Sequence, residues 1–165
     1  MFHCYENVVY PGHGVAQISR IIEKKVGGVS TSFYELSFLN KDVTVLVPTE
    51  NVEAVGLRRL SSSEHVALVF ETLNKPARCG RCPEFAASSW NKRNKGYQLK
   101  LRTGSLQELS EIYRDLRLIE AHKQLSFGEK NLLLRTEALL VEEISMIQQA
   151  DQNLVTEQLR AACHS

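Results

Sequence analysis

The sequence predicts an α+β fold, in which a small, strongly bent β-sheet or barrel precedes a bundle of about five α-helices. Residues 1–56 contain four or five short runs of β-branched and aromatic residues, separated by turn residues. From Ser61 onward, apolar residues recur at helical spacing behind Ser and Asp residues that suit helix N-caps. The length of 165 residues suits one domain of ordinary size or two small ones.

The predicted strands are short, and recognisable turns separate them. The first strand is N-V-V-Y, and P-G-H-G at residues 11–14 turns the chain. A Gly-Gly pair follows the second strand and is a strong signal for a β-hairpin. The expected strands after the first turn cover residues 15–25, 32–39 and 43–48.

Three of the predicted helices begin with the Ser-x-x-Glu pattern of a capping box. The pairs are Ser61 with Glu64, Ser105 with Glu108, and Ser126 with Glu129. The apolar stripes that should face the core are Leu106, Leu109, Ile112, Tyr113, Leu116 and Ile119, then Leu133, Leu140, Ile144 and Ile147. A last helix is expected from Asp151 through Leu154, Val155 and Leu159. The change of pattern predicts two domains, residues 1–58 and 59–165.

The net charge of +1 conceals one strongly basic segment. Residues 75–105 contain eight Lys or Arg and a single Glu, whereas residues 106–165 contain six basic and ten acidic residues. The single tryptophan of the chain, Trp90, lies in the basic segment and is followed by Lys92, Arg93 and Lys95. Such a segment is typical of a surface that binds a polyanion, and an exposed indole can enter a groove or stack on a base. A tryptophan packed between helices, with the cations merely solvated, is the alternative that the residues leave open.

The residues predict neither a metal site nor catalysis. Cys79 and Cys82 form the C-x-x-C half of a zinc site, but Cys4, Cys163, His65, His122 and His164 supply no second pair at ligand spacing. Reduced thiols in a loop are therefore expected. His13 lies between two turn glycines, and no nucleophile elbow or phosphate-binding loop accompanies it. We expect a protein that is not an enzyme and has no cofactor.

The sequence also predicts where in the cell the protein is located. No apolar run approaches the roughly 18 residues that span a bilayer, and the N-terminus has no pattern of a signal peptide. A cytoplasmic protein is expected, and nothing in the sequence requires more than a monomer.

The order of these features resembles the CarD/CdnL family of bacterial transcription regulators over nearly the whole chain. The matching stretches are V-V-Y-P-G-H-G-V-A (Val8–Ala16), V-T-V-L-V-P-T-E-N-V-E-A-V-G-L-R (Val43–Arg58), W-N-K-R-N-K (Trp90–Lys95), L-R-T-G before and at Gly104, Y-R-D-L (Tyr113–Leu116) and L-S-F-G-E-K (Leu125–Lys130).

The resemblance implies a Tudor-like (SH3-like) barrel at the N-terminus that docks on the β subunit of RNA polymerase. The implied polymerase contacts are Lys24, Leu46 and Pro48. Leu46 departs from the family because some relatives carry an arginine there, which replaces a salt bridge by an apolar or backbone contact. The same module occurs in transcription-repair coupling factors, whose helicase motor this chain lacks.

For the helical part, the resemblance implies non-sequence-specific binding to promoter DNA at the upstream edge of the melted bubble. Trp90 matches the family's tryptophan, which wedges into the minor groove, and Lys92, Arg93 and Lys95 match the basic positions beside it. The expected function is stabilisation of the promoter open complex. A polymerase adaptor that does not bind DNA is the alternative, and it requires Trp90 to be a core residue.

Overall fold

The computed structural model describes residues 2–75 and 90–163. Strands come first and helices follow, so the predicted α+β fold is confirmed. The chain divides into two compact units, Met1–Leu60 and Ser61–Ser165. This division falls later than the predicted boundary between residues 58 and 59, because the short strand β5 (Arg58–Arg59) pairs with β1 (Asn7–Tyr10) and belongs to the sheet.

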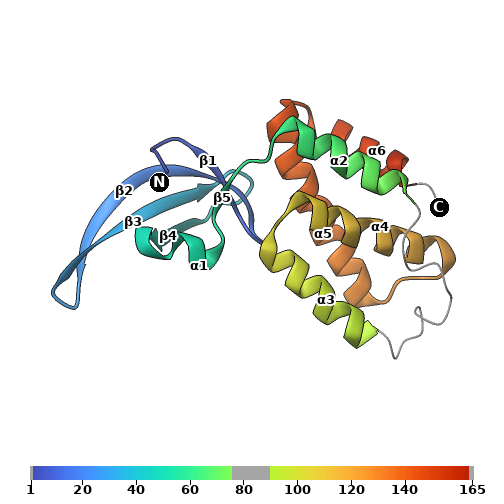
Figure 1. Ribbon diagram of the computed structural model, residues 1–165, viewed down its shortest axis with the longest axis horizontal. Coiled ribbons are helices and arrows are strands. Elements are labelled where there is room, and N and C mark those ends of the chain that lie inside the picture. Colours follow the sequence, from blue (N-terminus) through green and yellow to red (C-terminus); the bar gives the residue numbers. More distant parts are fainter. Residues whose placement is uncertain (1, 76–89, 164–165) are drawn as a thin grey trace. The chain divides into compact units, whose positions relative to one another are not determined.

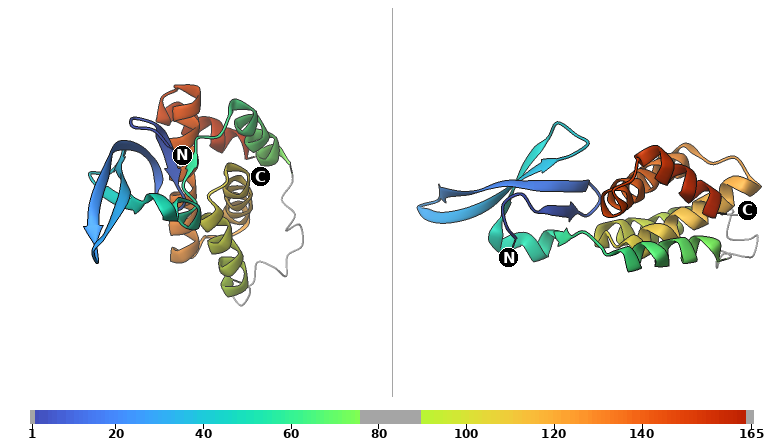
Figure 2. Two further views of the ribbon diagram at one scale, coloured as in Figure 1. Left: turned by 60° about the vertical axis from the view of Figure 1, so that its left-hand side comes forward. Right: turned by 90° about the horizontal axis from the view of Figure 1, so that it is seen from above.

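The first unit is an antiparallel sheet with the strand order β4-β3-β2-β1-β5. Its longest strands, β2 (Gly14–Val26) and β3 (Val29–Phe38), form the curved hairpin that is prominent in Figures 1 and 2. Strand β4 (Thr44–Pro48) lies at one edge, and a 3₁₀ turn (Thr49–Asn51) and helix α1 (Val52–Val55) connect it to β5. The predicted strands are present, although β3 starts earlier than expected because Val29 pairs with Val26 beside the turn.

Two glycines make the tight turn of this hairpin possible. Gly27 and Gly28 both have positive φ, 60° and 84°. Hairpin turns of this kind require positive φ at both central residues, a conformation that other residues rarely adopt.

An extra residue in β2 changes which side chains face the core. Ile18 pairs with Leu36, but the next pair is Arg20 with Glu35, so Ser19 has no partner across the ladder and forms a β-bulge. On a regular strand Arg20 would share the face of Ile18, which is fully buried. The bulge places Arg20 on the opposite face.

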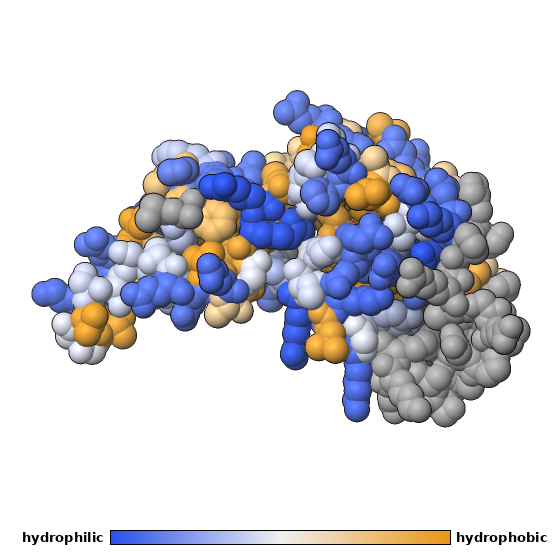
Figure 3. Space-filling view, viewed as in Figure 1, coloured by the Kyte–Doolittle hydropathy of each residue, from blue (hydrophilic) through white to orange (hydrophobic). Residues whose placement is uncertain are grey.

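The core of the sheet unit lies on the face that Ile18 shares. Its buried members are Val8, Ala16, Ile18, Tyr34, Leu36, Phe38, Val47 and Leu57. The far end of the β2–β3 hairpin extends beyond β1 and β4 as a two-stranded ribbon, and its apolar tip, which contains Val26 and Val29, is exposed (Figure 3).

The second unit contains five helices among the described residues. They are α2 (Ser63–Asn74), α3 (Trp90–Thr103), α4 (Leu106–His122), α5 (Phe127–Gln148) and α6 (Gln152–Ala162). They enclose one apolar core, to which all six residues of the predicted α4 stripe contribute. The predicted last helix is confirmed as α6, with Asp151 as its N-cap; Val155 and Leu159 are buried, whereas Leu154 is exposed because it faces away from the core.

The predicted helix caps are only partly correct. Ser126 accepts a hydrogen bond from the Glu129 backbone N–H at 3.3 Å, as predicted. Helix α2, however, is capped one residue later than expected, because Ser62 is the N-cap and its N–H donates to Nδ1 of His65 at 3.4 Å. Ser105 is the N-cap of α4 but makes no capping bond through its side chain, and Glu108 bonds to Thr103 instead.

Within residues 2–75 and 90–163, no helix has both the length and the apolarity needed to cross a membrane.

Candidate nucleic-acid and protein interfaces

Helix α3 carries the basic segment and is attached to the bundle by two apolar side chains. Tyr97 and Leu101 lie one turn apart on the same side of α3, and they are only 5% and 3% exposed. Both belong to the core of the helical unit, where α3 packs against α4. Apart from Gly96 and the exposed Leu99, the other described side chains of α3, in residues 94–103, are polar. The burial of Tyr97 and Leu101 is therefore the main contribution that fixes the helix in place.

Polar contacts fix the C-terminal end of α3 to α4. Lys100 Nζ lies 2.9 Å from Glu111 Oε2 on α4. Gly104 ends the helix with a positive φ of 66°, and its N–H donates to the Lys100 carbonyl at 3.3 Å. The positive charge of Lys100 is thus paired with the carboxylate of Glu111 within the helical unit.

A buried carboxyl lies close to this attachment point. Burial raises the pKa of Asp115, while Arg114 and Lys100 act in the opposite direction. Arg114 Nε lies 3.5 Å from Asp115 Oδ1. Arg114 and Lys100 therefore partly compensate the cost of burying the Asp115 carboxylate.

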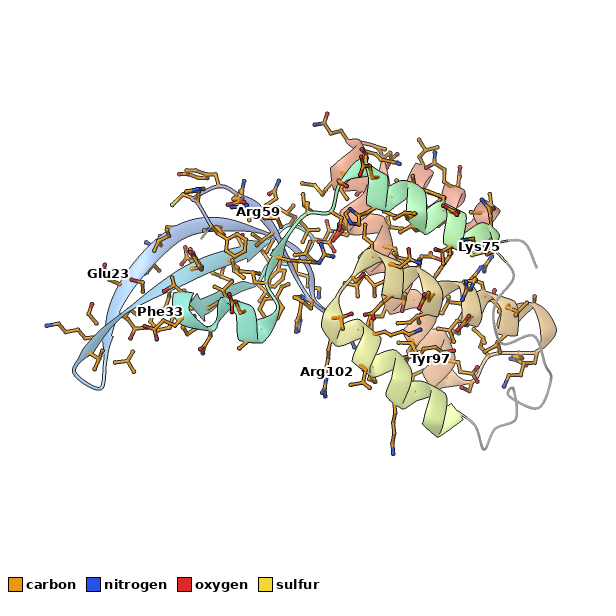
Figure 4. All side chains as sticks on the ribbon, viewed as in Figure 1. Glu23, Phe33, Arg59, Lys75, Tyr97 and Arg102 are labelled. Atoms are coloured by element: carbon orange, nitrogen blue, oxygen red, sulfur yellow. The ribbon has the colours of Figure 1, made fainter. Side chains whose placement is uncertain are left out.

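The side of α3 opposite Tyr97 is exposed and basic. Lys95, Leu99 and Arg102 follow one another at helical spacing, and Leu99 is 63% exposed. Arg102 points away from the bundle, whereas Tyr97 lies on the side of α3 that faces the other helices (Figure 4). Figure 3 shows apolar surface between two hydrophilic projections along α3. We call Lys95, Leu99 and Arg102 the outward face of α3.

The predicted DNA-binding residues fall at the N-terminal end of α3. Trp90 is the first residue of the helix, and Lys92 and Arg93 lie in its first turn. Their side chains lie outside the part that the structure describes. The backbone places Trp90 two turns before Tyr97, on the same side of the helix, and Lys92 on the side of Lys95 and Leu99. Of the four predicted residues, only Lys95 has a described side chain, and it is exposed.

The predicted polymerase contacts share one face of the sheet. Residues paired across an antiparallel ladder point to the same side. Leu46 pairs with Glu35, and Pro48 pairs with Phe33. Lys24 pairs with Thr31, whose side chain points to the same side as that of Phe33 because the two are two residues apart. Leu46, Pro48 and Lys24 therefore lie on the face opposite the core.

This outer face combines apolar and charged groups. Leu46 is 38% exposed, and Ile22 and Phe33 are half-buried beside it. Arg20 donates to both carboxylate oxygens of Glu35, at 2.8 and 3.3 Å, and this hydrogen bond raises the pKa of Arg20. The outer face thus offers an apolar strip bordered by an ion pair, next to the edge strand β4.

The sequence analysis did not name three residues that lie on the outward face of α3 or on the outer face of the sheet. Leu99 and Arg102 could have been found from their helical spacing with Lys95. Ile22 could not have been placed beside Phe33, because alternation alone does not reveal the bulge at Ser19.

The other candidate groups form no site in the described part of the chain. Cys79 and Cys82 lie outside the described residues. Among the described ones, no group of three or more His, Cys, Asp or Glu side chains could hold a metal ion. Burial raises the pKa of the Cys163 thiol to about 11, so this thiol is unreactive near neutral pH. His13 lies in the turn before β2, where its N–H donates to the Tyr10 carbonyl at 3.0 Å.

Comparisons with known proteins match both units. Residues 2–61 match the family model described as the CarD-like/TRCF RID domain, and residues 69–160 match the C-terminal domain of CarD. The chain is 27% identical over 150 residues to YdeB of Bacillus subtilis (strain 168), whose name proposes a transcription factor. This match covers 89% of the present chain and 92% of YdeB. One family model thus covers more than half of the chain and another covers the sheet, and the chain belongs to the CarD/CdnL family of transcription regulators.

Proposed function

We propose that this protein regulates transcription initiation without being an enzyme. In this proposal the sheet unit, a Tudor-like module, binds the β subunit of RNA polymerase. Helix α3 binds promoter DNA in the minor groove at the upstream edge of the melted bubble. The result is a longer-lived open complex.

The charge of α3 carries the DNA part of the proposal. Its sequence, W-N-K-R-N-K-G-Y-Q-L-K-L-R-T, contains five Lys or Arg and no acidic residue, in a chain whose net charge is only +1. Such a helix attracts phosphates without reading bases. The match to the C-terminal domain of CarD includes this helix and supports the same assignment.

The expected role of Trp90 follows from the energetics of unstacking. Inserting an apolar ring at a base step of intact duplex costs on the order of a few kcal/mol, because stacking is lost. At the edge of a bubble this stacking is already absent, so the ring binds melted DNA better than closed DNA. A ligand shifts an equilibrium by its differential affinity for the two states, and the open complex is thereby favoured.

The outer face of the sheet supports the polymerase part. Leu46 and Pro48 provide apolar surface beside the edge strand β4, and Lys24 adds a positive charge. Docking raises the local concentration of α3 near the promoter, so weak and non-specific DNA contacts suffice. The match to the CarD-like/TRCF RID domain supports a polymerase-binding role for this unit.

The test is the lifetime of promoter open complexes formed with purified polymerase. We expect wild-type protein to lengthen the lifetime and Trp90→Ala to lose that effect while still binding polymerase. Leu46→Glu should weaken polymerase binding itself, because it places a charge in the apolar strip. The matched control is Leu154→Glu, at another exposed leucine (49%) in the helical unit, which should behave like wild type. Full activity of Trp90→Ala would refute the wedge.

One observation favours a second candidate, an adaptor in which Trp90 is a core residue. The backbone of α3 places residue Trp90 on the same side of the helix as the buried Tyr97. Collisional quenching of the single tryptophan by acrylamide separates the candidates. Strong quenching that DNA suppresses supports the wedge, whereas weak quenching that DNA leaves unchanged supports the adaptor.

A further inference from the structure

We propose that the outward face of α3 lies along the DNA backbone, with Arg102 as a phosphate contact well separated from Trp90. This inference rests on the proposed function, because it requires α3 to bind DNA. It goes further by extending the contact from the N-terminal end of α3 to its last turn.

The first argument is geometric. Lys95, Leu99 and Arg102 are spaced so that all three lie on one side of the helix, opposite the buried Tyr97 and Leu101. At 1.5 Å per residue, Lys95 and Arg102 are about 10 Å apart along the axis. This distance corresponds to roughly three base-pair steps of B-DNA. One straight face can therefore reach phosphates several steps apart.

The second argument compares the two cations in the last turn of α3. Lys100 is about one-third exposed and is paired with Glu111 at 2.9 Å. Arg102 is exposed and points away from the bundle (Figure 4). The two side chains thus have different roles. Lys100 holds α3 on α4, while Arg102 presents its guanidinium, which binds phosphate through two parallel N–H groups.

Charge complementarity identifies the partner as nucleic acid. No acidic residue interrupts α3, so its outward face offers positive charge to a polyanion with no acidic neighbour on the same helix. Leu99 lies between the two cations and can contact the apolar part of the deoxyribose. A positive, elongated face of this kind fits a phosphate backbone better than it fits a folded protein.

The experiment is a salt titration of full-length protein on a DNA duplex with a preformed bubble. Each phosphate contact contributes about −0.9 to the slope of log K against log salt. Arg102→Gln should make the slope shallower by about 0.9, so that the affinity lost between 50 and 200 mM salt becomes about 3.5-fold smaller. Leu99→Lys should bind more tightly at low salt and make the slope steeper by about 0.9. A misfolded protein cannot produce that gain.

The control is Lys25→Gln, which removes an exposed cation from the sheet unit and should leave the slope unchanged. Wild-type slopes for both Arg102→Gln and Leu99→Lys, with wild-type binding intact, would overturn this inference alone. Absence of salt-dependent binding by the wild type would overturn the proposed function as well. If Leu99→Lys weakened polymerase binding without changing the DNA slope, the outward face would be a protein contact and the inference would be wrong.

Discussion

Gly96 lies in the middle of α3, where a glycine lowers helix stability. A methyl group added at this position would meet no atom within 4 Å. Gly96→Ala should therefore raise the free energy of unfolding of the helical unit by about 0.5–1 kcal/mol, because alanine loses less backbone entropy on folding. Urea denaturation followed by circular dichroism measures the change.

The matched control is the glycine that ends the same helix. Gly104 has a φ of 66°, a conformation in which a side chain is strained. Gly104→Ala should lower the free energy of unfolding by about 1 kcal/mol or more. If the two substitutions had the same sign, backbone conformation would not be the cause of either effect.

At the scale of the element, the caps of α4 and α5 form a natural pair for comparison. Ser126 accepts a hydrogen bond from the Glu129 N–H at 3.3 Å, whereas Ser105 makes no such bond through its side chain. Ser126→Ala should reduce the free energy of unfolding by about 1 kcal/mol. Ser105→Ala should cost clearly less. Equal losses, measured by the same denaturation assay, would contradict a role of the hydrogen bond.

The helices also show which features of a fold are determined by neighbouring residues in the sequence. The stripe of α4 could be predicted because six apolar residues repeat at one period over four turns, and every one of them is buried. The start of α2 could not be placed, since three consecutive serines offer alternative caps. The choice of Ser62 depends on His65, whose ring accepts the N-cap N–H.

At the scale of the whole molecule, the two units have separate apolar cores. The core of the sheet unit contains residues between Val8 and Leu57, and that of the helical unit residues between Val66 and Leu159. Each unit should therefore unfold by its own transition. Tryptophan fluorescence reports only the helical unit, because Trp90 is the single tryptophan. We expect the fluorescence midpoint of a fragment of residues 61–165 to match that of the full chain. A large shift would contradict independent unfolding.

The outward face of α3 and the outer face of the sheet differ in how far the sequence could predict them. The positive charge of α3 follows from its composition. The exposed side chain of Lys95 fits both alternatives that the sequence left open, because each of them places the cations in solvent. The role of Lys100 was not foreseeable, because its partner Glu111 belongs to another helix. On the sheet, Leu46 was named as a polymerase contact only through the resemblance. Its place on the edge strand and the residues that flank it depend on the long-range pairing of β3 with β4 and of β2 with β3.

The bulge at Ser19 decides to which side of the sheet every later residue of β2 points. If Ser19 were instead paired with Glu35 in the ladder, Arg20, Ile22 and Lys24 would point to the side of Ile18. Ile21 and Glu23 would then be displayed where Ile22 and Lys24 now lie. Deletion of Ser19 would leave Arg20 opposite Glu35 in a regular ladder and so keep the present faces, whereas one further inserted residue, paired in the ladder, would reverse them. The surface that the sheet offers to a partner is thus encoded by a one-residue frameshift in geometry, and an insertion there changes recognition more than any single substitution on the face itself.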